Sequence, residues 1–177
     1  MVDNCKNLLP ILYTTTEPTS SEPKRCVVVM DRLRAVTFRH GGHLRFTQDQ
    51  VTKIYPIDPS AEPIDVKVIA ISDTADLIVF HTINKDFDVY PDAVGDTDLG
   101  QSYKLIGIDA KGRPNVKGGV ISKKRVGFAI GDNHAEDGDS GAAIVDLRNC
   151  FIGMAIGRQD FIAPPNTVNG SMLNLAP

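Results

Sequence analysis

Residues 138–145 read GDSGAAIV, a serine between two glycines with a short apolar run behind it. Glycines on both sides allow a tight backbone turn that exposes the serine hydroxyl and leaves room for a substrate carbonyl. In such a turn the N–H groups of Gly138 and Ser140 can converge on one point, as an oxyanion hole requires. The alternative is a plain hairpin turn, because the preceding residues include Asp132, Glu136 and Asp137.

A serine nucleophile needs a general base, and the chain has four histidines. His40 ends an apolar segment and precedes two glycines, so its ring can project into a cleft. His43 is an alternative base three residues further on. His81 lies inside an apolar run, where a structural role is favoured. His134 is too near Ser140 in the sequence to be both its loop neighbour and its base.

A third group should orient the base and stabilise its charged form. Asp76 stands directly before the apolar run at residues 77–80, where an unpaired carboxylate would be costly. His40 would be a suitable partner for this carboxylate. Asp76 could instead cap the turn that precedes the run, and Asp73 and Asp65 are weaker alternatives for the third group.

Short apolar runs follow one another along the chain and predict strands rather than helices. Most are rich in valine and isoleucine, are bounded by Gly, Pro, Asp or Asn, and lack a sustained helical period. We therefore expect an all-β sandwich or barrel. Residues 8–13 are a further short strand or a helix packed on the body. The runs are residues 26–30, 35–38, 51–57, 65–71, 77–82, 104–108, 119–121, 126–130, 142–147 and 151–156.

The segment at residues 90–101 is the best linker candidate. It contains Pro91, Gly95, Gly100 and several aspartates, with few apolar side chains. It divides the predicted strands into two sets of similar size. We therefore predict an N-terminal domain at residues 1–90, a linker at residues 91–101, and a C-terminal domain with a tail at residues 102–177.

Composition excludes several functional classes. The 19 Lys and Arg against 22 Asp and Glu give a net charge of −3, which provides no general field for nucleic acid. The basic clusters at residues 23–25 and 123–125 are more typical of solvated hairpins than of an RNA site. No apolar run reaches membrane-spanning length, and the N-terminus lacks a signal-peptide layout. Cys5, Cys26 and Cys150 are too few and scattered for a disulfide framework or a metal site, and favour a reducing compartment.

Three segments of the chain together resemble the chymotrypsin-like serine proteases. Residues 35–40 are similar to that family's strand that ends in the catalytic histidine. Residues 76–79 are similar to its aspartate and the apolar strand that follows, and residues 138–141 match its nucleophile motif in full. The histidine, the aspartate and the serine also occur in the family's order along the chain.

The resemblance implies two antiparallel β-barrels, one in each predicted domain, with the active site in the cleft between them. It implies that His40, Asp76 and Ser140 form the catalytic triad of a serine endopeptidase that works through an acyl-enzyme. The N–H groups of Gly138 and Ser140 would then form the oxyanion hole. No metal and no other cofactor would be needed.

Within that family, the chain is most similar to the small proteases that positive-strand RNA viruses cut from their polyproteins. This implies that it processes a peptide or polyprotein substrate in the host-cell cytoplasm, without a nucleic-acid partner. Many viral relatives carry a histidine near the position of Ala155 that selects Gln or Glu at the cleaved bond, so no such preference is implied here. Phe38 and Gly41 differ from the small residue and the cysteine of cellular relatives.

The resemblance also places a substrate pocket between the segment before Ser140 and the strand after it. His134 would donate a hydrogen bond to a polar or acidic substrate side chain, unless it is simply an exposed loop residue. The backbone at residues 155–157 would offer the hydrogen bonds of a strand edge to an extended peptide. The expected substrate-binding residues are His134, Ala135, Ala155, Ile156 and Gly157.

Two alternatives stay open at the level of the sequence. The scaffold could serve mainly as a binding or structural module that cleaves itself once and then blocks its own cleft with the tail at residues 161–177, or that is inactive. It could also be an unrelated β-barrel binding domain with a chance triad, which would place His40 far from Ser140.

Overall fold

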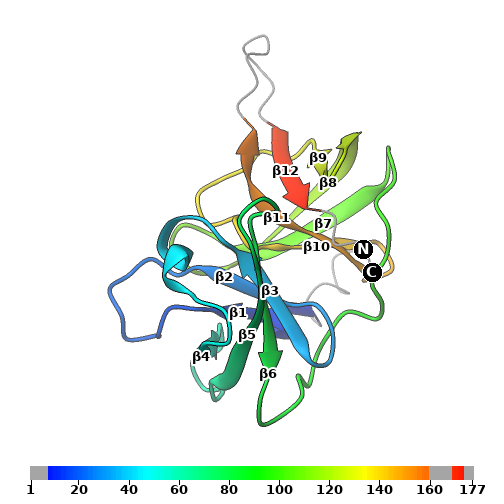
Figure 1. Ribbon diagram of the computed structural model, residues 1–177. Coiled ribbons are helices and arrows are strands. Elements are labelled where there is room, and N and C mark those ends of the chain that lie inside the picture. The colour runs from blue at the N-terminus through cyan, green and yellow to red at the C-terminus, as the bar shows by residue number, and fades with distance from the viewer. Residues whose placement is uncertain (1–7, 160–168, 174–177) are drawn as a thin grey trace.

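Twelve strands lie within the residues that the computed structural model describes, 8–159 and 169–173 (Figure 1). The first six are β1 Leu12–Thr14, β2 Cys26–Val29, β3 Arg34–Phe38, β4 Val51–Pro56, β5 Ile64–Ser72 and β6 Leu77–Thr82. The other six are β7 Ser102–Ile108, β8 Pro114–Arg125, β9 Phe128–Gly131, β10 Ala143–Asp146, β11 Phe151–Gln159 and β12 Asn169–Leu173. A short 3₁₀ helix, η2 (Gly41–Arg45), follows β3.

The strands close into two antiparallel β-barrels. The first barrel has the order β1-β2-β3-β6-β5-β4, and pairing of β1 with β4 closes it. The second has the order β10-β11-β12-β9-β8-β7, and pairing of β10 with β7 closes it. The prediction of an all-β fold made of two antiparallel barrels is therefore confirmed.

The segment between the two barrels lies against the second one. The strands of the first barrel end at Thr82 and those of the second begin at Ser102. Between them, Val94 forms a bridge with Phe151 of β11, and the Gly95 amide donates a 2.8 Å hydrogen bond to the Phe151 carbonyl. These contacts fix the connecting segment on β11.

Three elements differ from the sequence prediction. Residues 8–11 form a 3₁₀ turn and β1 follows, so both interpretations of that segment are partly right. The predicted run at residues 119–121 is the centre of a longer strand, β8, in which half-buried and exposed residues alternate at first. β12, for which the sequence indicates no apolar run, is a paired strand of the second barrel.

Strand alternation decides which side chains are buried. Val66 and Val68 of β5, and Ile78 and Phe80 of β6, are fully buried, while their neighbours in sequence are at least partly exposed. Each such side chain contributes about 1.5–3 kcal/mol when it leaves water. The apolar cluster of the first barrel continues into residues of the second: Ile106, Ile108, Ala143, Val145, Phe151 and Met154.

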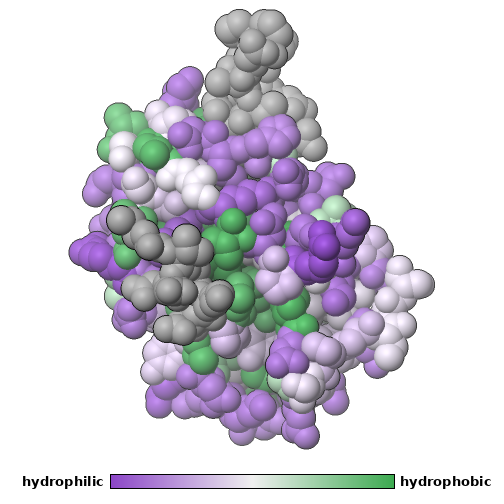
Figure 2. Space-filling model, turned by 180° about the vertical axis from the view of Figure 1, so that it is seen from behind, coloured by the Kyte–Doolittle hydropathy of each residue, from purple (hydrophilic) through white to green (hydrophobic). Residues whose placement is uncertain are grey.

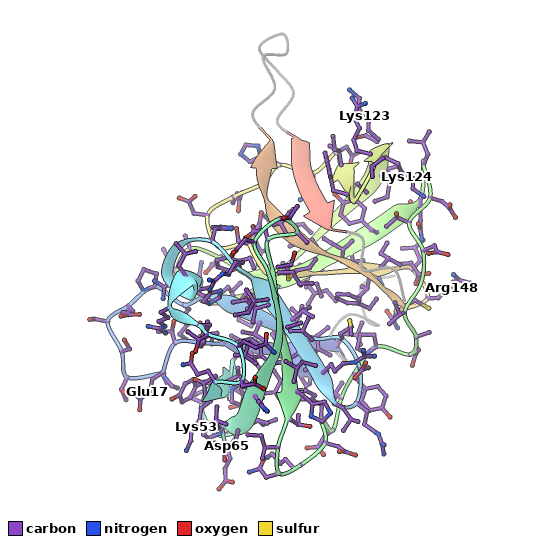
Figure 3. All side chains as sticks on the ribbon, viewed as in Figure 1. Glu17, Lys53, Asp65, Lys123, Lys124 and Arg148 are labelled. Atoms are coloured by element: carbon purple, nitrogen blue, oxygen red, sulfur yellow. The ribbon has the colours of Figure 1, made fainter. Side chains whose placement is uncertain are left out.

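The surface is mostly hydrophilic. Figure 2 shows one face on which polar residues predominate and apolar residues gather near the centre. The basic cluster of the β8–β9 hairpin is exposed, and Figure 3 places Lys123 and Lys124 at its outer end. The Lys124 ammonium contacts the Thr97 carbonyl oxygen. Among the described residues, no helix has both the length and the apolar character needed to cross a membrane.

The two barrels approach each other closely at Gly141. This residue has a φ of +87°, a conformation that favours glycine. A Cβ atom at this position would lie 2.3 Å from the Cys26 carbonyl oxygen and 3.1 Å from the Phe38 ring. The turn that carries Ser140 is therefore pressed directly against β2 and β3 of the first barrel.

The first prediction concerns this contact. Gly141→Ala should lower the free energy of unfolding by about 2–4 kcal/mol, because it combines backbone strain with a backbone clash. Gly127→Ala is the matched control, since Gly127 has a φ of +83° but open space around the position of a Cβ. The control should cost about 1 kcal/mol. Equal losses in the two variants, measured by urea denaturation, would contradict the contact.

Candidate active site

Strand pairing places His40 beside Asp76. Phe38, the last residue of β3, lies opposite Leu77, the first residue of β6, so the residues just beyond them meet at one end of the barrel. The Arg39 amide donates to the Asp76 carbonyl at 3.2 Å, which extends this pairing by one step. The histidine and the aspartate thus come together although 36 positions separate them in sequence.

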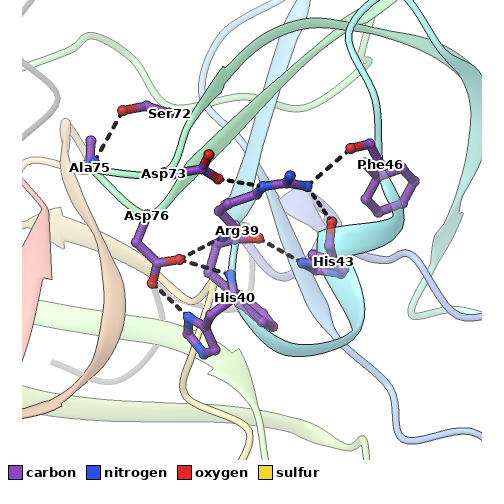
Figure 4. Close-up of polar contacts among 9 residues, drawn as sticks. Arg39, His40, His43, Phe46, Ser72, Asp73, Ala75 and Asp76 are labelled. Atoms are coloured by element: carbon purple, nitrogen blue, oxygen red, sulfur yellow. Dashed lines mark hydrogen bonds and ion pairs between the residues drawn. The ribbon is translucent and has the colours of Figure 1, made fainter.

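The Asp76 carboxylate holds both the backbone and the ring of His40 (Figure 4). Its Oδ1 accepts hydrogen bonds from the amides of Arg39, at 2.9 Å, and His40, at 2.8 Å. Its Oδ2 lies 2.6 Å from His40 Nδ1. Since an ionised carboxylate only accepts, Nδ1 carries a hydrogen, and in the neutral tautomer of this ring the lone pair is on Nε2. The His40 side chain is 49 % exposed, so Nε2 has the tautomer and the access of a general base.

The alternative base, His43, is completely buried. Its Nδ1 lies 2.7 Å from the Phe38 carbonyl and donates to it, so Nε2 accepts the hydrogen bond of the Thr15 hydroxyl at 2.7 Å. Burial is the main cause that lowers the pKa of His43 to about 4, and the hydrogen bond to Phe38 opposes it. Its ring is therefore a neutral structural group that supports the region beneath His40.

The alternative acids have other partners. Asp73 accepts a 2.8 Å hydrogen bond from Arg39, and Asp65 lies near Lys53 and Asn84. Among the described residues, neither carboxylate contacts His40. Asp76 has a φ of +52°, unusual for an aspartate, so its backbone is held in a turn that aims the carboxylate at β3.

Arg39 and Phe38 fix the surroundings of His40. The Arg39 guanidinium donates to the carbonyls of His43, at 2.9 Å, and Phe46, at 3.0 Å, and so ties down helix η2. The Phe38 ring lies between the two histidine rings, with centroids 4.5 Å from His40 and 4.4 Å from His43. The His40 ring therefore rests on a packed aromatic support.

The turn around Ser140 presents two backbone amides that have no partner within the described residues. They belong to Gly138 and Ser140, the pair expected to form an oxyanion hole. The amides of Asp139, Gly141 and Ala142, in contrast, donate hydrogen bonds to backbone carbonyls at 2.7–3.1 Å. Gly138 has a φ of +103°, and a Cβ there would lie 2.7 Å from the Ile108 carbonyl oxygen.

Asp139, the residue before the serine, is almost fully buried, with 5 % exposure. Its carboxylate contacts the Lys117 ammonium at 2.8 and 3.0 Å and accepts a 2.7 Å hydrogen bond from the Glu136 amide. Burial alone would lower the pKa of Lys117, but the hydrogen bonds to Asp139 and Glu136 outweigh it and raise the pKa. This lysine is therefore fully charged at neutral pH.

Ser140 lies close to the end of β3. The adjacent Gly141 packs against Phe38, and the Phe38 ring contacts His40. Ser140 is half-buried, and within the described residues its hydroxyl makes no hydrogen bond to His40. Such bonds are often long without substrate and tighten when substrate binds.

The predicted substrate-binding residues occupy two segments. His134 is exposed and Ala135 is buried in the segment that leads to Ser140. Ala155 is buried in β11, its amide donates to the Ala142 carbonyl at 2.9 Å, and its carbonyl accepts from the Gly141 amide at 2.7 Å. The expectation that Ala155 offers a free strand edge is therefore wrong, because its backbone groups hold the Ser140 turn.

The next two residues of β11 differ from Ala155. A register shift in the pairing with β12 leaves Ile156 opposite no residue. Gly157 has a φ of +142°, and a Cβ there would meet nothing within 4 Å. Gly157 nevertheless pairs with Ser171 of β12, and a strand-edge role for Ile156 and Gly157 stays a prediction.

The predicted tail at residues 161–177 lies only partly within the described residues. Its residues 169–173 are β12, which pairs with β9 and β11 and so belongs to the second barrel. These residues are therefore part of the barrel and not of a free tail, and the rest of the tail lies outside the described residues. Among the described residues, no group of three or more His, Cys, Asp and Glu side chains is arranged to hold a metal ion.

Cys26 is a buried, free thiol at the contact between the barrels. Burial, together with the nearby Asp139 charge, raises its pKa to about 12. Thiolate chemistry is therefore suppressed at this position. Its backbone carbonyl has a structural role, since it accepts a 2.6 Å hydrogen bond from the Thr37 hydroxyl beside Gly141.

The chain is similar in fold to several solved protease structures. The protease domain of MamO from Magnetospirillum magneticum matches with a TM-score of 0.71 and 14 % identity, over 95 % of this chain and 93 % of that one. The active form of the Rv3671c protease from M. tuberculosis matches with a TM-score of 0.71 and 15 % identity, over 97 % and 78 %. The fold is that of the chymotrypsin-like serine proteases.

A third similar structure, the serine endoprotease from Yersinia pestis, has a TM-score of 0.69 and 16 % identity, over 96 % of this chain and 60 % of that one. No protein-family model and no curated protein sequence matches the chain. At such low identities the likeness establishes the chymotrypsin-like fold alone. These bacterial structures give no support to the viral part of the sequence resemblance.

The second prediction concerns His43. The pKa of His43 is 6.5 in the unfolded chain, whereas in the folded chain it is lowered to about 4. The folded state therefore loses stability as the pH falls through this window, by about 2 kcal/mol between roughly pH 6.5 and 4.5. His43→Gln removes the titration and should show a flatter decline in urea denaturation. Parallel pH profiles for the two proteins would contradict the assignment.

Proposed function

We propose that this protein is a serine endopeptidase with the triad His40, Asp76 and Ser140. The observation that carries the proposal is the hold of Asp76 on His40, through two backbone amides and the ring nitrogen. The backbone contacts alone would suffice to cap the β5–β6 turn, so the additional contact of Asp76 with the exposed His40 ring favours a catalytic role. The chymotrypsin-like fold supports the proposal, because the similar structures include a protease domain and a serine endoprotease.

In the proposed reaction, His40 Nε2 takes the proton of the Ser140 hydroxyl as its oxygen attacks the substrate carbonyl. Asp76 stays ionised and stabilises the imidazolium that forms. His40 then gives the proton to the leaving amine, which yields an acyl-enzyme. Water deprotonated by His40 hydrolyses the acyl-enzyme and restores Ser140.

The amides of Gly138 and Ser140 would bind the negative oxygen of the tetrahedral intermediate. Their freedom from other partners among the described residues supports this role. A donor of this kind contributes about 2.7–4 kcal/mol to the stability of the transition state. Backbone donors need no protonation, so their contribution does not depend on pH.

The substrate would be an extended peptide that passes between the segment before Ser140 and the end of β11. The residues proposed to line its binding site are His134, Ala135, Ala155, Ile156 and Gly157. Processing of a viral polyprotein in the host-cell cytoplasm is a narrower proposal, and it rests on the sequence resemblance alone.

The third prediction tests the activated serine. A fluorophosphonate should form one adduct on Ser140, because the probe reacts only with a serine that has a base and an oxyanion hole. Ser140→Ala should abolish the adduct, and His40→Ala should slow its formation at least about 10³-fold. Intact-mass and peptide mass spectrometry measure both effects.

Ser102→Ala is the control, since Ser102 is an exposed serine at the start of β7. It should be labelled at the wild-type rate. An adduct that survives Ser140→Ala, or a folded wild-type protein that stays unlabelled, would overturn the proposed function. The second result would favour a binding or structural module on the same scaffold.

A further inference from the structure

The connection between β1 and β2, residues 15–25, reaches the edge of the proposed active site. It lies beside helix η2, which begins directly after His40 (Figure 1). Its last residue, Arg25, precedes the β2 carbonyl that packs against Gly141. The connection therefore ends next to the Ser140 turn and next to the helix that follows the proposed base.

Arg25 occupies the space that the missing side chain of Gly42 leaves open. A Cβ atom at Gly42 would overlap the Arg25 guanidinium, so the guanidinium lies against the backbone of η2. Gly42 is two residues from His40 in the chain. The Arg25 side chain is only 20 % exposed, so its charge is held at a defined place beside the His40 backbone.

Arg45, at the end of η2, is the second cation on this side of the site. The Glu22 carboxylate lies between the two guanidinium groups, 3.2 Å from Arg25 and 3.6 Å from Arg45. One carboxylate cannot neutralise two guanidinium charges, so positive charge is in excess here. After burial, the charges of both arginines are further causes that lower the pKa of His43.

Lys24 extends the positive surface to the second barrel. A Cβ atom at Gly112, in the β7–β8 turn, would lie 2.5 Å from the Lys24 side chain. The end of β7 also packs on the proposed oxyanion turn, since a Cβ at Gly138 would lie 2.7 Å from the Ile108 carbonyl oxygen. The interpretation of residues 23–25 as a solvated hairpin is thus only partly right, because both cations of this cluster are half-buried.

The proposed reaction defines which part of a substrate reaches these cations. His40 gives its proton to the leaving amine, so the residues that follow the cleaved bond begin at the His40 ring. Asp76 occupies the other nitrogen of that ring. The acyl part of the substrate lies on the second barrel, along the segment before Ser140. The leaving part therefore passes over η2 and the end of the β1–β2 connection.

We propose that Lys24, Arg25 and Arg45 form a cationic subsite that binds acidic side chains in the first three residues after the cleaved bond. This subsite rests on the proposed protease function and adds a substrate class to it, peptides with Asp or Glu on the leaving side. A guanidinium can bind a carboxylate by two parallel hydrogen bonds, and partial burial strengthens the attraction. Glu22 pairs with both arginines and so competes with the substrate carboxylate.

The fourth prediction compares peptides that differ by one charge. Mass spectrometry of a digested mixture of random-sequence peptides supplies a parent sequence. Matched peptides then carry Glu or Gln at one of the three positions after the cleaved bond. The value of kcat/KM for the Glu peptide should exceed that for the Gln peptide about tenfold, and about 0.5 M NaCl should reduce this ratio, because salt screens the attraction.

Variants of the cluster test which charges carry the preference. Arg25→Gln should lower the ratio for Glu over Gln to below about threefold, whereas Glu22→Gln should raise it at least about twofold, because the competing carboxylate is gone. Arg45→Gln should also lower it, and it keeps the test valid if Arg25→Gln folds poorly. Arg32→Gln is the control, because Arg32 pairs with Asp86 beyond the other end of β3, and the ratio should stay at its wild-type value.

A second readout does not depend on cleavage. In Ser140→Ala, the peptide acetyl-Glu-Glu-Glu-amide should shift the NMR amide signals of Arg25 and Gly42, whereas acetyl-Gln-Gln-Gln-amide should leave them in place. Equal cleavage of the Glu and Gln peptides would overturn the subsite and leave the protease function standing. A wild-type protein that a fluorophosphonate never labels would overturn the protease function, and the NMR shifts would still decide whether the cluster binds acidic peptides.

Discussion

The contact of Gly141 with the Cys26 carbonyl and the Phe38 ring is the constraint on which the rest of the site depends. The histidine and the aspartate come from the first barrel, whereas the serine turn comes from the second. A side chain at residue 141 would push the Ser140 turn away from the part of the site that the first barrel carries. The shared apolar core sets the barrels against each other, and this glycine lets them approach closely enough for Phe38 to lie under both the turn and the His40 ring.

Two carboxylates then fix the two halves of the site in the same physical way. Asp76 accepts backbone amides and an imidazole, and so orients the base; Asp139 accepts a backbone amide and an ammonium, and so orients the turn. Each carboxylate is satisfied by several donors, which makes its position well defined, and Asp139 is also buried. Ser140 and His40 provide the atoms proposed to react, and Asp139 and Asp76 hold them in place.

The sequence predicts the strand-rich fold and the order of the candidate site residues, because valine-rich runs and a glycine-flanked serine are local signals. It does not predict β8 in full or β12, since alternating exposed residues and the Asn169-Gly170 pair resemble loops until tertiary pairing forms. The buried state of His43 is also invisible, because it depends on Thr15, which lies 28 positions away. The role of Lys117 is likewise not predicted, because Lys117 lies on β8 and its partner Asp139 lies in the connection between β9 and β10.

We infer that Ser140, His40 and the two turn amides converge on one reacting centre. A crystal structure of the protein after reaction with a fluorophosphonate tests this claim directly, because the phosphoryl group mimics the tetrahedral intermediate. We expect phosphorus bonded to Ser140 Oγ, one phosphoryl oxygen within about 3 Å of the amides of Gly138 and Ser140, and His40 Nε2 facing the adduct. A phosphoryl oxygen that points to solvent, with His40 turned away from Ser140, would contradict it.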